Sequence, residues 1–222
     1  MIGIFGGTFD PVHYGHLRCA LELHQDLSLT EVRLIPCRIP PHRDTPHASV
    51  EQRLRMLQVA LDSTPGLVVD TRELSREGPS YSVDTLHALR AEVGTTPLCL
   101  ILGQDAFNGL DSWHRWQELI ELAHIVVAHR PGWAPAQSGS VAELLSRHGV
   151  TAAEHLHKQP AGCILPWAVT ALEISASAIR ALVNNGKSPR FLLPDAVWGI
   201  IANEGLYAAT EQVSSPGGRG SS

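Results

Sequence analysis

Short runs of apolar residues alternate along the chain with segments in which apolar residues recur every three or four positions. The run pattern, which is typical of strands, occurs at Met1–Phe5, Val32–Pro36, Leu67–Asp70, Pro97–Gly103 and Ile125–Ala128. The helical pattern falls between these runs, at Gly15–Gln25, after a capping box formed by Ser49 and Gln52, at Val83–Glu92 and at Trp113–Leu122. This alternation predicts an α/β fold, a doubly wound parallel sheet with right-handed crossovers.

The last third of the chain has a less regular pattern. We expect a strand pair near Cys163–Leu165 and Thr170–Glu173, followed by helices at Ser177–Asn184 and Asp195–Asn203. Before them, Pro131–Gly139 reads as a surface connection to a helix at Val141–His148. The expected organisation is a core over residues 1–174, a small C-terminal helical subdomain over 175–207 and a disordered tail over 208–222.

Composition narrows the class of protein. Of the 222 residues, 44% are hydrophobic and 18% are charged, which is a globular balance. The sequence has no apolar run of about 18 residues and no signal-peptide pattern at Met1–Asp10, so we expect a cytoplasmic protein without a membrane partner. The net charge of −5 argues against sequence-independent binding of nucleic acid. The four cysteines are too widely spaced for a zinc ribbon or a disulfide framework.

A loop suited to phosphate follows the first expected strand. Gly6 and Gly7 let backbone amides approach an anion closely, and the loop runs into a helix N-terminus, which favours negative charge. His13 and His16 are three positions apart at the start of that helix, so both side chains can reach one anion. A metal-binding pair is one alternative, but no further ligand accompanies it. A pair of capping or packing histidines is another, and it does not account for the glycine pair.

The segment Gly6–Leu17, GGTFDPVHYGHL, resembles the signature of the HxGH nucleotidyltransferase superfamily, in the form found in bacterial nicotinate mononucleotide adenylyltransferases. Further segments agree with that family along nearly the whole chain: Ile39–Arg43, Gly78–Leu86, Gly103–Asp105, Trp113–Trp116, Arg130–Gly132 and Ile174–Arg180. The resemblance implies a Rossmann-like nucleotidyltransferase fold. It also implies adenylyl transfer from ATP to nicotinate mononucleotide, giving nicotinate adenine dinucleotide (deamido-NAD) and pyrophosphate in NAD biosynthesis.

The resemblance places an ATP site around the glycine loop. His16, with His13 and Thr8, is expected at the α-phosphate, and Arg180 with Ser177 at the β- and γ-phosphates, where a planar fork of donors fits well. The residues alone also allow Ser175 to be an ordinary helix N-cap followed by a surface arginine. The full expected ATP set is Gly6, Gly7, Thr8, Phe9, His13, His16, Gly103, Asp105, Ser175, Ser177 and Arg180, with His13, His16 and Arg180 acting in catalysis.

Asp105 follows a buried strand by two residues, at the sheet edge where substrates bind. A carboxylate there can accept hydrogen bonds from ribose hydroxyls or contact magnesium; alternatively it is the N-cap of a short helix, and the two roles are compatible. We expect no all-protein metal cage, because Mg²⁺ arrives on the triphosphate with most of its waters.

The mononucleotide site is expected where Tyr81 and Ser82 open a helix, because first-turn N–H groups can hold the nicotinate carboxylate. Trp113 can stack on the pyridine ring, although Trp113 and Trp116 also read as core aromatics. His42 and Arg43 read either as a mobile basic finger or as part of a solvated loop. The expected set is Thr8, His42, Arg43, Ser82, Asp105, Trp113 and His114.

Two other functions remain open from the sequence. Pantetheine-phosphate adenylyltransferases share the loop, but they are usually shorter and lack the PSYS-x-D-T segment and the tryptophan pair. A non-catalytic nucleotide sensor would keep the glycines and lose a catalytic side chain, whereas His13, His16 and Arg180 are all present. The expected partners are ATP and nicotinate mononucleotide, and the sequence is compatible with a homo-oligomer.

Overall fold

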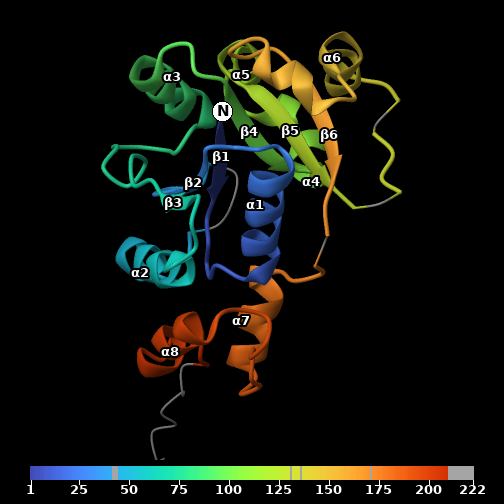
Figure 1. Ribbon diagram of the computed structural model, residues 1–222. Coiled ribbons are helices and arrows are strands. Elements are labelled where there is room, and N and C mark those ends of the chain that lie inside the picture. Colours follow the sequence, from blue (N-terminus) through green and yellow to red (C-terminus); the bar gives the residue numbers. More distant parts are fainter. Residues whose placement is uncertain (42–44, 131, 136, 171, 210–222) are drawn as a thin grey trace, which may run out of the picture.

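A computed structural model describes residues 1–41, 45–130, 132–135, 137–170 and 172–209 of the chain (Figure 1). These residues form one sheet of six parallel strands in the order β3-β2-β1-β4-β5-β6. The strands are β1 (Ile2–Gly7), β2 (Glu31–Pro36), β3 (Leu67–Val69), β4 (Leu98–Gly103), β5 (His124–His129) and β6 (Ile164–Ala168). The expected doubly wound α/β fold is confirmed.

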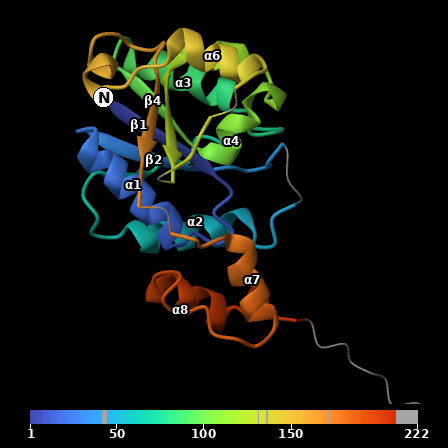
Figure 2. The same cartoon turned by 90° about the vertical axis from the view of Figure 1, so that its right-hand side faces the viewer.

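Helices cover both faces of the sheet, with α3, α4 and α6 on one side and α1 and α2 on the other (Figure 2). The α-helices are α1 (Tyr14–Asp26), α2 (Val50–Leu61), α3 (Ser82–Val93), α4 (Gln104–Asn108), α5 (Trp116–Leu122), α6 (Ser140–His148), α7 (Ala176–Asn184) and α8 (Asp195–Asn203). Two short 3₁₀ helices, η1 (Leu110–Ser112) and η2 (Ala153–His157), complete the described elements.

Strand β4 shows why the two faces are both apolar. Leu98, Leu100 and Leu102 pack in the core beneath α3, and the alternate residues Cys99 and Ile101 pack in the core beneath α1 and α2. Because successive side chains of a strand point to opposite faces, an unbroken apolar run is what a strand buried on both sides requires.

Helix α2 begins as the capping box predicts. The Gln52 amide nitrogen donates to Ser49 Oγ at 3.2 Å, and Gln52 Oε1 accepts from the Ser49 backbone at 2.8 Å. Its buried face differs from an apolar stripe, however, because it includes Arg53 together with Met56 and Leu57. A buried arginine on this face indicates that α2 also makes polar contacts with the segments beneath it.

The expected helix over Trp113–Leu122 is wrong at its start. Helix α5 begins at Trp116, because Arg115 adopts a left-handed conformation with φ of 51°. Trp113 consequently lies in the connection after η1 and not on a helix.

The expected strand pair in the last third is also wrong. Residues from Ile164 form β6, which pairs in parallel with β5, and the described part of Thr170–Glu173 is not a strand. Instead, the backbone N–H and the hydroxyl of Thr170 both donate to Glu22 on α1. The Thr170 N–H is thus bound to a side chain of α1 and is not available to a second strand.

The C-terminal helices α7 and α8 lie at one end of the molecule, next to α1 and α2 (Figures 1 and 2). Val197 and Ile201 of α8 share a core with Met56 and Leu57 of α2. The division into a core over 1–174 and a helical part over 175–207 stays a prediction. Of the expected tail, residues 210–222 lie outside the described residues, as do His42 and Arg43. None of the helices in the described ranges is long and apolar enough to cross a membrane.

Candidate active site

The strand order reverses between β1 and β4, which lie side by side. The chain leaves β1 toward α1 on one face, and it leaves β4 toward α4, whose Phe107 packs in the core of the opposite face. Loops that diverge in this way leave a crevice beyond the carboxyl ends of the strands, which is where doubly wound sheets bind ligands. The glycine loop and Asp105 both lie at this edge.

The glycine loop is shaped by tight packing on one side and open space on the other. A Cβ atom at Gly7 would come within 2.9 Å of the Phe9 ring, whereas one at Gly6 would meet no described atom within 4 Å. Phe9 is buried and has a φ of 49°, which turns the chain back over the strand end. Within the described part of the chain, the backbone N–H groups of Thr8 and Phe9 have no acceptor. The loop therefore offers donors that an anion can use.

The two histidines lie together, as expected. His13 is the N-cap residue of α1, and its ring stacks on that of His16 with the centroids 3.8 Å apart. The Phe9 ring lies 5.1 Å from that of His16, so aromatic groups hold the His16 ring from two sides. Gly15 allows this arrangement, since a Cβ there would lie 3.0 Å from the His13 ring. The capping alternative is wrong for His13, because its side chain makes no capping hydrogen bond.

His13 is neutral near pH 7. Its side chain is buried, and burial lowers the pKa of the imidazole from its ordinary 6.5 to about 4. Its Nδ1 atom has no hydrogen-bond partner among the described residues. A neutral ring can give one N–H to a phosphate oxygen without adding a charge, and it leaves the formal positive charge at the site to the arginines.

Arg180 reaches the glycine loop from α7. Its Nη1 donates to the backbone carbonyl of Asp10 at 2.6 Å, and its Nη2 donates to Ser177 Oγ at 3.3 Å. Ser175 is the N-cap of α7 and accepts from the Ala178 amide at 3.1 Å. The capping alternative for Ser175 is thus confirmed, while the simple surface role for Arg180 is wrong because its guanidinium is held against the loop.

Asp10 joins these elements, although the sequence indicated no role for it beyond the motif. Its carboxylate is buried and accepts from the amides of His47 at 2.8 Å and Ala48 at 3.1 Å and from the Tyr207 hydroxyl at 2.7 Å. Burial and this carboxylate raise the pKa of Tyr207. The Asp-Pro sequence in the loop is a weak signal for such a hub, and residue 207 could not be paired with it from spacing alone.

A cavity of about 370 Å³ opens beside Arg180 and Tyr207. It is lined by His47, Ser177, Arg180, Ala181, Asn184 and Tyr207. Two of the expected phosphate ligands, Ser177 and Arg180, therefore line this open cavity.

Three of the expected mononucleotide residues, Ser82, Trp113 and His114, lie in neighbouring segments. Tyr81 is the N-cap of α3, and its ring lies 4.3 Å from that of His114, so the helix N-terminus at Ser82 lies near the Trp113–His114 segment. Ser82 and Gly6 line one small cavity of about 10 Å³. Trp113 is half-buried against the core, so the core interpretation holds for part of its ring.

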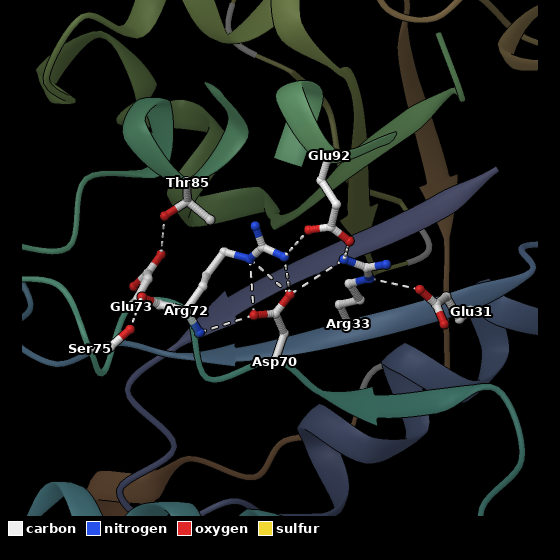
Figure 3. Close-up of polar contacts among 8 residues, drawn as sticks. All are labelled: Glu31, Arg33, Asp70, Arg72, Glu73, Ser75, Thr85 and Glu92. Atoms are coloured by element: carbon white, nitrogen blue, oxygen red, sulfur yellow. Dashed lines mark hydrogen bonds and ion pairs between the residues drawn. The ribbon is translucent and has the colours of Figure 1, made fainter. Parts of the chain in front are cut away.

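A buried carboxyl group forms the wall of that small cavity. Glu73 accepts from the Thr85 hydroxyl at 2.6 Å (Figure 3), and burial raises the pKa of Glu73. The sequence pattern predicts no role for Glu73, and its place in the TRELSREGPSYS segment, near Ser82, is the only local signal for one.

Asp105 lies within the first turn of α4, and Gly103 is the N-cap, so the N-cap alternative for Asp105 is wrong. Its side chain is exposed at the crevice, and a Cβ at Gly103 would meet no described atom within 4 Å. Among the residues that the structure describes, no group of three or more His, Cys, Asp or Glu could hold a metal ion.

Residues 4–182 match the family model described as cytidylyltransferase-like, and the chain is a member of this class of nucleotidyltransferases. Two curated relatives, each named probable nicotinate-nucleotide adenylyltransferase, come from Methylococcus capsulatus and Cellvibrio japonicus. The first is 52% identical over 94% of this chain and 100% of its own length, and the second is 53% identical over 93% and 98%. The chain belongs to the nicotinate-nucleotide adenylyltransferase family.

Solved structures agree in fold. A nicotinic acid mononucleotide adenylyltransferase of Plasmodium falciparum, complexed with NaAD, superposes with a TM-score of 0.71 at 16% identity and covers 93% of this chain and 96% of its own. The match confirms the nucleotidyltransferase fold expected from the sequence.

Proposed function

We propose that this protein transfers the adenylyl group of ATP to nicotinate mononucleotide, releasing pyrophosphate. The observation that carries the proposal is the contact between Arg180 of α7 and the backbone of Asp10 in the glycine loop, at 2.6 Å. This contact brings the Arg180 guanidinium and the hydroxyls of Ser175 and Ser177 to the end of the sheet that carries the stacked rings of His13 and His16. A triphosphate needs such a set of donors.

In the reaction, an oxygen of the mononucleotide phosphate attacks the α-phosphorus of ATP. The bond from that phosphorus to the bridging oxygen breaks, and its electron pair leaves with pyrophosphate. Because the attacking phosphate is already anionic, no general base and no covalent intermediate are needed. Catalysis then rests on positioning and on stabilising charge at the α-phosphate and at the leaving group.

The roles of the site residues follow the resemblance to the family, and the contacts described above support them. The loop N–H groups and the rings of His13 and His16 bind the α-phosphate, and Arg180 and Ser177 bind the β- and γ-phosphates beside the 370 Å³ cavity. Mg²⁺ enters as part of the ATP complex, and Asp105 is placed to contact it or the ribose. The roles of His42 and Arg43 over the triphosphate remain predictions from the sequence, as do a cytoplasmic location and a homo-oligomer.

The acid specificity is assigned to the N-terminus of α3. N–H groups at Ser82 and around His114 offer only donors, which suits a carboxylate, whereas the amide nitrogen of nicotinamide would face donors of its own kind. A mispaired buried polar group costs about 1–3 kcal/mol, so we expect a preference for the acid of at least about tenfold. Trp113 stacks on the ring.

The test is a pyrophosphate-release assay with ATP, Mg²⁺ and one of three acceptors: nicotinate mononucleotide, nicotinamide mononucleotide or phosphopantetheine. We expect turnover with the first and at least tenfold lower kcat/KM with the second. Turnover with phosphopantetheine alone would replace the proposal with the pantetheine-phosphate activity. ATP binding without turnover of any acceptor would make the protein a sensor. Trp113→Ala should raise KM for the mononucleotide and leave KM for ATP unchanged.

A further inference from the structure

Arg53 of α2 is the largest fully buried side chain of the described residues, with an exposure of 1%. Its guanidinium donates to three backbone carbonyls. Nη1 donates to Thr8 and to Cys37, both at 2.8 Å, and Nη2 donates to Arg38 at 3.4 Å. Thr8 lies in the glycine loop, and Cys37 and Arg38 follow β2. One side chain therefore fixes two of the loops that surround the crevice.

The charge of Arg53 has no carboxylate partner in the described ranges. The ion pairs there involve other arginines and two histidines, and the buried carboxylate of the loop, Asp10, accepts from Tyr207 and two amides and lies 3.9 Å from Arg180. Arg53 Nε also has no hydrogen-bond partner among these residues. Taking a cation out of water is expensive unless an opposite charge compensates it. An anionic ligand beside the glycine loop would supply that charge.

The hydrogen bond to Thr8 also orients the loop. A trans peptide is planar, with its C=O and N–H pointing in opposite directions. Because the Thr8 carbonyl points at Arg53, the Phe9 N–H of the same peptide points away from it, and no described acceptor takes that N–H. Arg53 thus aims a backbone donor at the side of the loop assigned to phosphate.

The Arg38 segment that Arg53 binds is itself hydrogen-bonded to the segment that precedes α3, on the mononucleotide side. The Arg38 amide donates to Ser80 Oγ at 3.0 Å, and the Ser80 amide donates to the Ile39 carbonyl at 3.0 Å. Ser80 lies two residues before α3. This link is indirect, so Arg53 bears directly on the ATP loop and only remotely on the acceptor site.

We propose that Arg53 is a positioning residue for the triphosphate of ATP: it holds the Thr8–Phe9 peptide in its anion-binding orientation, and its charge is compensated by the bound phosphates. The inference rests on the proposed function only in taking ATP as the nucleotide. It assigns Arg53 no contact with substrate.

The test uses the full chain with Arg53→Gln and Arg53→Lys, and Arg55→Gln as the matched control. Arg55 lies on the same helix, but its side chain is 52% exposed and pairs with Glu204. Binding of ATP–Mg²⁺ is measured by titration calorimetry without any acceptor, and KM and kcat are then measured for both substrates. Measuring ATP binding alone separates this inference from the identity of the acceptor.

For Arg53→Gln we expect ATP affinity to fall about 10- to 100-fold, because the charge-assisted hydrogen bonds that hold the Thr8–Phe9 peptide and the nearby positive charge are both lost, with KM for the mononucleotide changed less than threefold. Arg53→Lys keeps the charge and loses the fork, so its ATP affinity should lie between those of wild type and Arg53→Gln. Arg55→Gln should bind ATP like wild type. If Arg53→Gln does not fold, Arg53→Lys serves as the test: its ATP affinity should fall while its KM for the mononucleotide stays within threefold of wild type.

Three results would overturn the inference. The first is ATP affinity within threefold of wild type in a folded Arg53 variant. The second is an equal rise in KM for both substrates, which would mark a general structural role. The third is a wild-type protein that binds no ATP. A wild type that binds ATP and ignores nicotinate mononucleotide would refute the proposed acceptor and leave the Arg53 test intact.

Discussion

Two groups of arginines in this molecule differ in the partners of their guanidinium groups. At the edge of the sheet, Arg33 and Arg72 lie among three carboxylates, those of Glu31, Asp70 and Glu92, with the pairs 2.7 to 3.6 Å apart (Figure 3). At the glycine loop, Arg53 donates to three backbone carbonyls, and Arg180 donates to one carbonyl and one hydroxyl, with the already engaged Asp10 carboxylate 3.9 Å away. The first group is electrically satisfied within the chain.

This difference in partners separates arginines that stabilise the fold from arginines that serve function. A guanidinium whose carboxylate partners are supplied by its own chain is a structural element, since a further anion would have to displace them. A guanidinium that is held by neutral carbonyls keeps its charge available to a phosphate. Substitutions at the loop should therefore change catalysis or, for His13, the pH dependence of stability. Substitutions of the Arg33–Arg72 group should change stability slightly and catalysis not at all.

His16→Ala should give the largest effect. A preorganised donor at a developing charge contributes about 10²–10³ in kcat, and the His16 ring is held in place by its contacts with His13 and Phe9. We expect a loss of that size with the unfolding midpoint nearly unchanged, measured by steady-state kinetics and thermal denaturation. His87→Ala, at an exposed position beside Glu118, is the control. Near-normal turnover of His16→Ala would refute the proposed mechanism.

The next effect concerns pH. Since the folded-state pKa of His13 is about 4 and its ordinary value is 6.5, the unfolded chain binds the proton first. Stability is therefore full above about pH 6.5 and falls as the pH is lowered to about 4, by up to about 3 kcal/mol from this residue. Buried His124, whose pKa is also lowered, adds a loss of the same sign. Glu92 adds a loss of the same sign only at and below its ordinary pKa of 4.5, because Arg72 and Arg33 hold its folded-state pKa low.

Denaturant unfolding at several pH values checks this, with His13→Asn as the variant. Its stability should depend less steeply on pH between 6.5 and 4 than that of wild type. His87→Asn should keep the wild-type slope. Equal slopes for His13→Asn and wild type would show that His13 is not the buried neutral group described above.

Arg180→Ala should raise KM for ATP more than KM for the acceptor. Hydrogen bonds to charged groups contribute about 1.5–3 kcal/mol, so KM for ATP should rise at least about tenfold and KM for the mononucleotide much less. Arg180→Lys should rescue only partly, because the fork that reaches both Asp10 and Ser177 is lost. Unchanged KM and kcat in Arg180→Ala would show that Arg180 holds the loop without binding the triphosphate.

The residues of the site were predictable from the sequence to different degrees. His13, His16 and Arg180 lie in motifs whose local pattern already joins glycines, helix starts and donors. Asp10 and Tyr207 were not predictable as a pair, because nothing in either segment records a contact between residues 197 positions apart. The burial of Arg53 was predictable, since Arg53 lies three and four positions before Met56 and Leu57 on one helix face.

The same limit applies to the fold. The doubly wound sheet follows from the alternation of patterns, and the unbroken apolar run of β4 marks its centre. The start of α5 depends on the left-handed conformation of Arg115, a residue type that gives no such signal. Beyond β6, Thr170 donates to Glu22 of α1, a contact between residues 148 positions apart that no local pattern records. Both errors arose where distant or unusual backbone contacts decide the local structure.

The smallest expected effect is at the sheet edge. Arg72→Met keeps much of the apolar stem of the side chain and removes its bonds to Asp70 and Glu92. Because the pair is partly exposed, we expect a loss of about 1 kcal/mol and a fall in Tm of about 2–4 °C, reduced at high salt. Kinetic constants should stay within twofold. Arg147→Met, whose pair with Glu143 is over two-thirds exposed on both sides, should change neither stability nor activity. A tenfold loss of kcat/KM in Arg72→Met at unchanged Tm would break the division between paired and available arginines, since a satisfied guanidinium would then act on the reaction.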